Sequence, residues 1–589
     1  MNTSAIYHRP ESEFAYLYNE ATMHIRLQTA REDVKAVYLV HGDPYLVNKE
    51  QWYQKKVPMQ KLLSTQLHDY WQISVGAKFR RIAYGFIVEG VDGTTAFYGD
   101  QGIFPATEEY LSTPNLYYRL PYFHQTDRVK VPEWVKQTVW YQIFPERFAN
   151  GDTTNDPKGT LAWGSEEPTP FNFFGGDLQG VRNHLDHLVD LGVNGLYFCP
   201  IFKATSNHKY DTEDYFTIDP AFGDDETFKA LVEECHARGI KVMLDAVFNH
   251  IGDNSPQWQD VIKNGEKSKY ADWFHIHEFP VSYTEGDNFE DAIDLTYDTF
   301  AFTPHMPKLN TANPEVQEYL LSIAKYWIEK FDIDAWRLDV ANEVDHAFWK
   351  KFRQTCDASK KDFYILGEIW HSSQRWLQGD EFDAVMNYAF TDAIKAYFVK
   401  DEIPLTKMVA QMNQQLMLYR MQTNQVQLNV LDSHDTPRLL TEVAGDKDLA
   451  RQIMAFTYLQ MGVPCVYYGT EYAMEGEFDP GCRKCMVWDE KDQDLEMYEF
   501  MKLLIAFRKD YQPILSEGSL EWLAVDDRTG IVSLARQLED RLLVATFNTG
   551  DQPVTMPVSE RTVLSQNTQE NQILPKGFVI TYWVIQKVL

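Results

Sequence analysis

The chain has 589 residues, of which 44% are hydrophobic and 24% are charged, the usual mix of a globular protein with several domains. Its 55 Lys and Arg against 86 Asp and Glu give a net charge of −31. A charge this negative repels phosphate backbones and anionic lipid surfaces, so we expect neither a nucleic-acid partner nor a role at a membrane surface.

The sequence lacks the patterns of a secretory signal, a membrane span and a disulfide framework. The first twenty residues show neither the basic nor the apolar region of a secretory signal, and no apolar run reaches the length of a membrane span. The six cysteines are scattered, and the pair Cys482 and Cys485 has no second pair at metal-ligand spacing. We therefore expect a cytoplasmic protein without a disulfide framework.

The N-terminal part, residues 1–123, has the pattern of a β-domain. Residues 23–27, 36–40, 71–75 and 82–88 alternate between apolar and polar, and Gly and Asp turn residues lie between these runs. Short strands at regular spacing predict a β-sandwich.

Residues 124–508 change to strands that alternate with helical segments. The segment 225–238 is typical: Phe228, Leu231, Val232 and Cys235 repeat with helical spacing, and Gly239 follows the last turn. The predicted strands are residues 142–144, 195–198, 241–247, 335–340, 364–369, 384–386, 427–431 and 463–468.

Eight such strands predict an α/β fold, a (β/α)8 TIM barrel, with an inserted subdomain at about 251–313 after the third strand. A doubly wound sheet is the alternative, but no glycine-rich phosphate-binding motif follows any strand. Residues 509–589 return to short β-runs and predict a C-terminal β-sandwich.

Four predicted barrel strands end in acidic residues. Asp245, Asp339, Glu368 and the pair Asp432 and Asp435 each follow a buried apolar run, beside His or Arg. Because active sites of such barrels lie at the carboxyl ends of the strands, these acids predict a catalytic site.

Spacing suggests a division of labour between two of the acids. Arg337 and Asp339 are two residues apart, so they face the same way, and the guanidinium is expected to lower the pKa of Asp339, as a nucleophile requires. Trp370 is placed likewise beside Glu368, where an apolar neighbour is expected to raise the carboxyl pKa, as a general acid requires. Such a pair with aromatic platforms indicates glycoside cleavage.

The ordered motifs resemble those of the α-amylase family of glycoside hydrolases, in its neopullulanase, cyclomaltodextrinase and maltogenic amylase group. The segments are 245–250 (DAVFNH), 336–343 (WRLDVANE), 367–370 (GEIW) and 433–435 (SHD), with the group's phrases at 140–148, 306–310 and 462–469. The resemblance covers nearly the whole chain.

This resemblance implies a retaining mechanism with named roles. Asp339 matches the nucleophile, Glu368 the general acid/base and Asp435 the third catalytic carboxylate, and retention implies about 5–5.5 Å between Asp339 and Glu368. Asp245 is expected to orient Arg337. The implied substrate-binding residues are Tyr210, His250, Arg337, His434, Trp370, Glu343, Asp479 and Arg483.

A loop rich in Asp, Asn and Gly follows the first barrel strand. Its carboxylate and carbonyl oxygens suit Ca²⁺, although the residues alone indicate an Asx-rich turn at least as strongly. The resemblance implies a structural Ca²⁺ held by Asn150, Asp152, Asn155, Asp156, the Gly175 carbonyl and Asp177.

The resemblance also implies the substrates: α-1,4 and some α-1,6 bonds of cyclodextrins, pullulan and starch-derived oligosaccharides, with transglycosylation. It implies a homodimer with the N-terminal domain at the interface. An α-glucosidase or transglycosylase remains an alternative, as does a non-catalytic carbohydrate-binding protein of the same fold.

Overall fold

A computed structural model describes residues 1–46, 52–288, 291–556 and 561–585 of the chain. It divides into two compact units. The first comprises Met1–Lys130, Ala389–Gln425 and Ser516–Leu589, and the second Val131–Tyr388 and Val426–Leu515. Residues 389–425, which the sequence pattern assigns to the barrel domain, are thus grouped with the two terminal parts.

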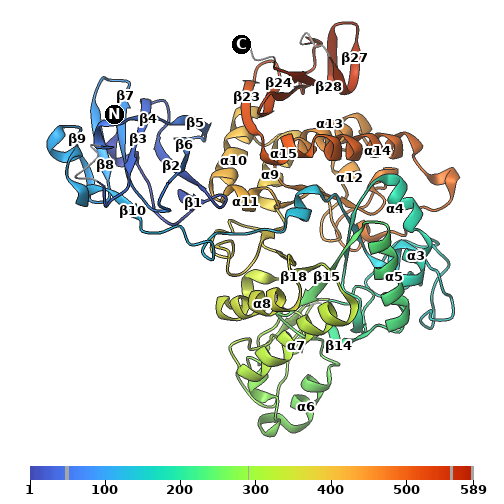
Figure 1. The fold of residues 1–589 in the computed structure, drawn as a ribbon. Coiled ribbons are helices and arrows are strands. Elements are labelled where there is room, and N and C mark those ends of the chain that lie inside the picture. The colour runs from blue at the N-terminus through green and yellow to red at the C-terminus, as the bar shows by residue number, and fades with distance from the viewer. Residues whose placement is uncertain (47–51, 289–290, 557–560, 586–589) are drawn as a thin grey trace. The chain divides into compact units, whose positions relative to one another are not determined.

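The N-terminal part of the first unit is a sandwich of two antiparallel sheets (Figure 1). Its apolar core includes Ile25, Leu39, Trp71 and Phe86, from the strands that the alternating pattern predicts. One sheet has the order β1 (Ala15–Leu17), β2 (Thr22–Ala30), β6 (His68–Gly76), β5 (Gln60–Ser64). The other has the order β4 (Val57–Pro58), β3 (Val34–Gly42), β7 (Ile82–Gly90), β8 (Thr95–Gly99), β9 (Gly102–Pro105), with β10 (Tyr118–Leu120) on β7.

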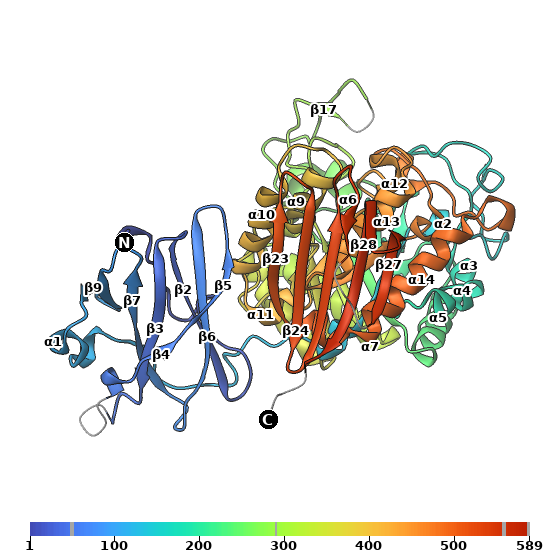
Figure 2. The ribbon, with the colours of Figure 1, turned by 90° about the horizontal axis from the view of Figure 1, so that it is seen from above.

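The C-terminal part of this unit is one antiparallel sheet in the described residues, and its long strands lie side by side in Figure 2. Its order is β23 (Ser519–Asp526), β24 (Ile531–Leu538), β25 (Arg541–Asn548), β28 (Gln572–Val584), β26 (Val554–Thr555), with β27 (Thr562–Gln569) also on β28. Helix α10 (Leu405–Met417) links the two β-parts, since Asn413 accepts a hydrogen bond from Trp522 and donates one to the Ser64 carbonyl. The unit also holds α11 (Met421–Asn424) and most of α9 (Tyr388–Phe398).

The second unit confirms the predicted barrel. Eight of its described strands form one parallel sheet, and a bridge between Met386 and Leu428 closes the ends onto each other, which excludes the open doubly wound alternative. The order is β20 (Ala384–Val385), β19 (Tyr364–Gly367), β18 (Ala335–Asp339), β15 (Lys241–Val247), β12 (Gly195–Phe198), β11 (Trp140–Ile143), β22 (Val463–Tyr467), β21 (Leu428–Val430).

Helices follow the strands as the periodicity predicts. In α5 (Asp225–Ala237) the apolar positions Phe228, Leu231, Val232 and Cys235 are buried, and Asp224 caps the first turn through the Thr227 amide. The other long helices of this unit are α7 (Pro314–Phe331), α8 (His346–Ser359), α13 (Lys447–Tyr458) and α14 (Leu495–Asp510), and shorter ones are α2 (Pro145–Phe148), α3 (Leu178–Asn183), α4 (Leu185–Leu191) and α12 (Leu439–Glu442).

The inserted segment after β15 has its own small apolar cluster. Trp258 on α6 (Pro256–Asn264) packs edge-on and tilted against Phe274 and Tyr297. A bridge from His250 to Lys308 and a hydrogen bond from the Leu309 amide to the Asn249 carbonyl bind the segment to the carboxyl end of β15. The segment therefore stands beside the strand ends. Its hairpin is β16 (Thr284–Glu285) with β17 (Ala292–Ile293), and the unit has another, β13 (Phe202–Ala204) with β14 (Thr212–Ile218).

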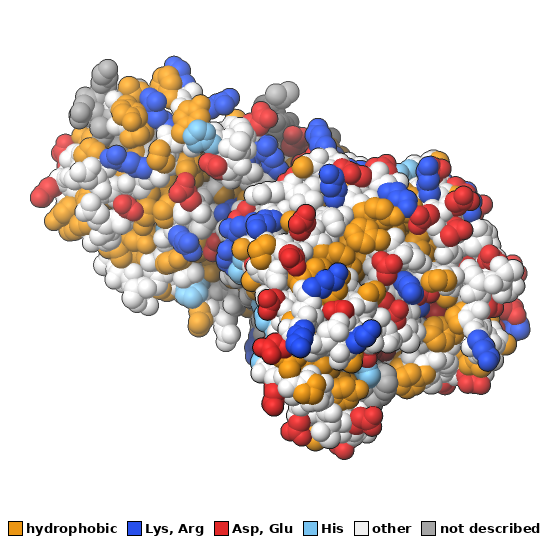
Figure 3. Space-filling view, turned by 90° about the horizontal axis from the view of Figure 1, so that it is seen from below, with side chains coloured by type: hydrophobic (Ala, Val, Ile, Leu, Met, Phe, Trp, Pro, Cys, Tyr) orange, Lys and Arg blue, Asp and Glu red, His pale blue; other side chains and the backbone are white. Residues whose placement is uncertain are grey.

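On the face shown in Figure 3, acidic and basic side chains are intermixed with small apolar areas. No helix among the residues that the structure describes combines the length and the apolar character needed to cross a membrane.

Candidate active site

A cavity of about 480 Å³ opens at the carboxyl ends of the barrel strands. Asp339 is the last residue of β18, Glu368 follows β19, and Asp435 lies on the loop after β21. All three line the cavity, as the strand-end pattern predicts. Six of the predicted binding residues line it as well: Tyr210, His250, Trp370, His434, Asp479 and Arg483.

Arg337 lies buried beneath this cavity and joins three carboxylates. Its Nη1 is 2.9 Å from Asp245 and 2.7 Å from Asp339, and its Nη2 is 2.9 Å from Glu368. Strand register explains the first contact, because Asp245 on β15 is paired directly with Arg337 on β18. Asp245 is therefore placed to orient the guanidinium, and the guanidinium holds Asp339 and Glu368 side by side.

The prediction of a lowered pKa for Asp339 is wrong for the substrate-free site. Burial and the neighbouring Glu368 carboxylate raise the pKa of Asp339 well above its usual range, and Arg337 only partly opposes them. Three buried carboxylates around one guanidinium leave excess negative charge, so the site favours keeping a proton.

The Glu368 carboxylate accepts two hydrogen bonds at the end of its strand. One comes from the Trp370 indole N–H at 3.2 Å, so the tryptophan acts as a hydrogen-bond donor and not as the apolar neighbour expected from the sequence. The other comes from the Val340 amide at 2.9 Å. Val340 has φ +45°, a left-handed conformation that is strained for a β-branched residue and turns its amide toward Glu368.

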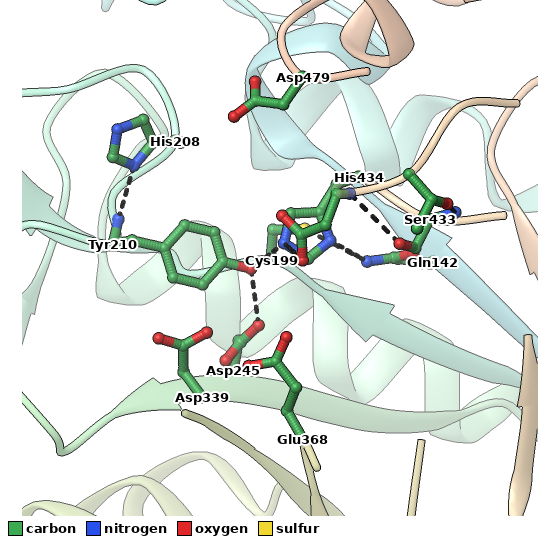
Figure 4. Close-up of polar contacts among 12 residues, drawn as sticks. Gln142, Cys199, His208, Tyr210, Asp245, Asp339, Glu368, Ser433, His434 and Asp479 are labelled. Carbon is green, nitrogen blue, oxygen red and sulfur yellow. Dashed lines mark hydrogen bonds and ion pairs between the residues drawn. The ribbon is translucent and has the colours of Figure 1, made fainter. Parts of the chain in front are cut away.

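On another wall of the cavity, His434 and Tyr210 lie together (Figure 4). Their rings are parallel to within 3°, and the Tyr210 hydroxyl is 2.5 Å from His434 Nε2. Asp435 is 3.2 Å from the same Nε2 and 3.3 Å from Arg483, which also pairs with Asp479 at 2.8 Å.

Both predicted histidines are neutral at the site. Burial lowers the pKa of His250 to about 3, and burial with the nearby Arg483 and Arg337 lowers the pKa of His434 well below its usual value. Each neutral ring thus carries one N–H donor and one acceptor nitrogen.

Two of the predicted substrate-binding residues, Arg337 and Glu343, are not among the described residues that line the cavity. Arg337 is fully buried, and Glu343 forms an ion pair with Lys308 at 2.9 Å. Trp370 is 45% exposed and stacks on Tyr388 with ring centroids 3.8 Å apart.

Sequence reasoning missed several wall residues. Phe300 and Met306 of the inserted segment line the cavity, and Phe300 stacks on His250. Met306 opens the motif at 306–310, and His208, which also lines the cavity, stands two residues before the predicted Tyr210. Phe300 lies in a segment without a motif.

The predicted calcium loop is folded around Asp177. Asp177 Oδ1 accepts from the Gly180 and Gly151 amides, and Oδ2 from the Asp152 amide and the Asn155 side chain. Asn150 donates to Asp156 at 2.8 Å. Gly175, at φ +81°, comes so close to Asn150 and Asp156 that a Cβ would collide with them.

Two side-chain oxygens of this loop are available to coordinate a cation. Asn150 Oδ1 and Asn155 Oδ1 are buried and find no hydrogen-bond partner among the described residues. No group of three or more His, Cys, Asp or Glu side chains in the described chain is arranged to hold a metal ion. The loop therefore fits Ca²⁺ through neutral oxygens together with the acids, since Ca²⁺ accepts amide and carbonyl ligands.

Comparison with known proteins gives consistent matches. The chain matches the family model "Alpha amylase, catalytic domain" over residues 142–502 and "Alpha amylase, N-terminal ig-like domain" over residues 1–124.

Named relatives cover almost the full length. An intracellular maltogenic amylase of Bacillus subtilis is 53% identical over 94% of this chain and 92% of its own. A cyclomaltodextrinase of Geobacillus thermopakistaniensis is 49% identical over 95% and 93%. A solved structure of a cyclomaltodextrinase has a TM-score of 0.88 with 45% identity and covers 99% of both chains.

Proposed function

The chain belongs to the α-amylase family of glycoside hydrolases and is an α-glucan hydrolase of the maltogenic amylase and cyclomaltodextrinase type, and we propose that it works by retention. Its proposed bonds are α-1,4 glucosidic links, with some α-1,6 links, in cyclodextrins, pullulan and starch-derived oligosaccharides. The observation that carries the proposal is the single guanidinium of Arg337, which holds Asp339 and Glu368 at one cavity wall.

In the first step, an Asp339 oxygen attacks the anomeric carbon of the sugar and the glycosidic C–O bond breaks. Glu368 gives its proton to the departing oxygen, which leaves as a free hydroxyl. The products are a glycosyl ester on Asp339 and an ionised Glu368. The indole N–H of Trp370 and the amide of Val340 are in place to stabilise the new charge on Glu368.

In the second step, Glu368 takes a proton from a water molecule whose oxygen attacks the same carbon. The ester bond breaks, Asp339 regains its charge and Glu368 its proton, and the configuration of the sugar is retained. When a sugar hydroxyl takes the place of water, the same step forms a new glycosidic bond, which is the proposed transglycosylation.

The remaining cavity residues are proposed to bind the sugar at the cleavage point. Tyr210 offers a ring face, and neutral His250 and His434 offer N–H donors. Asp435 accepts hydrogen bonds from sugar hydroxyls, and Arg483 with Asp479 holds the next sugar. Trp370, stacked on Tyr388, is proposed as an acceptor-side platform, and Glu343 is proposed to act on the same side.

Ca²⁺ is proposed as a structural ion of the loop after β11. Asn150, Asp152, Asn155, Asp156, Asp177 and the Gly175 carbonyl would hold it. Bound there, the ion would supply positive charge to the unpaired buried oxygens and brace the loop without entering the chemistry.

A homodimer is proposed, with the N-terminal sandwich at the interface. This sandwich carries exposed aromatic side chains, Tyr45 (76% exposed) and Phe79 (45%), and the Arg81 guanidinium lies over both rings. Exposed aromatic and Arg side chains are enriched at protein interfaces. A cytoplasmic location is proposed because the Bacillus subtilis relative is named as intracellular.

The experiment for substrate preference is timed product analysis on β-cyclodextrin, pullulan and soluble starch side by side. We expect cyclodextrin opened to linear maltooligosaccharides and pullulan cut at its α-1,4 links. Release of glucose alone from chain ends, with cyclodextrin untouched, would instead indicate the exo-acting α-glucosidase.

A further inference from the structure

A line of buried hydrogen bonds crosses the barrel beneath the cavity (Figure 4). Asp245 Oδ2 lies 2.9 Å from the Tyr210 hydroxyl, and that hydroxyl lies 2.5 Å from His434 Nε2. The other ring nitrogen, His434 Nδ1, lies 2.7 Å from Gln142 Nε2 on the first barrel strand. All four side chains are at most 8% exposed, so water does not compete for these contacts.

The ionised Asp245 at one end of this line determines which group donates in each hydrogen bond. Asp245 binds the Arg337 guanidinium with both oxygens, and although burial raises its pKa to about 6, it is ionised at neutral pH and only accepts. The pKa of Tyr210 is raised well above its usual value by burial, so its hydroxyl keeps its one proton and donates it to Asp245. The Tyr210 oxygen must then accept a hydrogen bond from an N–H at His434 Nε2.

His434 is neutral, so a proton on Nε2 leaves a lone pair on Nδ1. The atom facing this lone pair is the amide nitrogen of Gln142, which can only donate. Its second N–H faces the Cys199 sulfur at 3.6 Å, and Oε1 has no hydrogen-bond partner among the described residues. Turning the amide over would set an oxygen lone pair against the Nδ1 lone pair.

We propose that Gln142 is a positioning residue that fixes His434 as the neutral tautomer protonated on Nε2, so that its one N–H lies on the cavity side beside Tyr210 and Asp435, where a sugar hydroxyl can share it. Gln142 does not line the cavity itself, whereas His434 does. Only the last step, donation to a sugar hydroxyl, rests on the proposed function. The tautomer itself is a property of the unliganded protein.

Several charged or titratable groups surround His434 and enter any pH dependence. The Cys482 thiol and the Arg483 Nε both donate to its backbone carbonyl. The side chains that face its ring or act on its charge are Asp435, Tyr210, Arg337, Arg483, Glu368 and His208.

Three variants isolate the role of Gln142. Glutamate in Gln142→Glu has the same shape as glutamine but presents only acceptors, so it requires a proton on His434 Nδ1. Gln142→Met has a similar length and removes the donor. Gln427→Glu is the matched control, because Gln427 is 1% exposed, lies next to β21 at the opposite end of the barrel and accepts from the Val385 amide.

The first measurement is ¹⁵N NMR of the histidine-labelled, unliganded protein, with His434 assigned by loss of its signals in His434→Asn. We expect the wild type and Gln427→Glu to show one proton on Nε2 from about pH 5 to about pH 8. We expect Gln142→Glu to show a proton on Nδ1. A wild-type proton on Nδ1, or an unchanged His434 in Gln142→Glu, would overturn the proposal whatever the enzyme's substrates prove to be.

The second measurement is the pH profile of kcat/KM on β-cyclodextrin. We expect both Gln142 variants to lose about 10-fold at neutral pH, the effect of one lost hydrogen bond to the sugar. In Gln142→Glu the new carboxylate raises the pKa of His434, and the doubly protonated ring still donates from Nε2. Activity of this variant relative to wild type should therefore fall as pH rises. A relative activity that stays flat or rises with pH would contradict the proposal.

Discussion

Arg337 is fully buried, and three carboxylates surround its guanidinium. Its planar guanidinium places Nη1 against Asp245 and Asp339 and Nη2 against Glu368 at once, which the point charge of a lysine cannot do. The relative placement of nucleophile and acid/base thus depends on the shape of one side chain as well as on its charge.

Arg337→Lys tests this dependence. Because the lysine keeps the charge but reaches fewer carboxylates, Asp339 and Glu368 lose their common support, and kcat should fall by about 10²-fold or more. Steady-state kinetics on β-cyclodextrin measures the effect. Arg353→Lys is the control. Arg353 is also buried and forms an ion pair with Asp383 at 2.8 Å, but it does not line the cavity. Equal losses in both variants would mean that the effect is one of stability alone.

The raised pKa of Asp339 predicts the acidic side of the activity profile. The nucleophile must be ionised, so kcat/KM, which reports the free enzyme, should rise with pH through the pKa of Asp339. Burial and Glu368 raise that pKa. The acidic limb of kcat/KM should accordingly lie clearly above pH ~4, the ordinary aspartate range. A kcat/KM profile that stays level down to pH ~4 would show that the pKa of Asp339 is not raised.

At the scale of elements, the sequence predicted the strands and their acidic ends well, because buried parallel strands appear as continuous apolar runs and an acid at the end of one stands out. Local conformation was not predictable. Nothing in the sequence marks Val340 for a left-handed conformation, which exists because the turn after β18 aims its amide at Glu368. The pKa of Asp339 was missed for a similar reason, since i, i+2 spacing reveals Arg337 but not Glu368, which comes from another strand.

The loop after β11 gives a prediction about metal binding. If Asn150 Oδ1 and Asn155 Oδ1 complete a calcium site, Ca²⁺ should raise the melting temperature over chelator-treated protein, by an amount equivalent to about 2.7 kcal/mol at 100 times Kd. Asn155→Ala should lose most of this gain. Thr160→Ala, which removes a hydroxyl that donates to the Pro157 carbonyl, should keep it. A melting temperature that does not respond to Ca²⁺ in the wild type would rule the site out.

At the scale of the whole chain, length and alternating pattern predicted the barrel and its flanking β-parts, which the structure and the family matches confirm. The grouping of residues 389–425 with the terminal parts was not foreseen. It depends on contacts over long sequence distances, such as that between Asn413 and Ser64, which leave no local pattern.

The proposed dimer gives a prediction at the same scale. At micromolar concentration the mass from light scattering should be twice that of the 68.6 kDa chain. Tyr45→Ser combined with Phe79→Ser should shift the protein toward monomer, because it removes the exposed aromatic contacts. Leu523→Ser, an exposed apolar residue of the C-terminal sheet, is the control and should leave the mass unchanged. A wild-type mass equal to that of one chain would contradict the proposed homodimer.

The most direct test of the retaining mechanism is the configuration of the first product. Proton NMR recorded during the first minutes of β-cyclodextrin hydrolysis separates α- from β-anomers before they equilibrate in water. Attack by Asp339 on one face of the sugar, followed by water on the opposite face that the leaving group has vacated, predicts that the new reducing end appears first as the α-anomer. A β-anomer as first product would mean direct attack by water and would contradict the role given to Asp339.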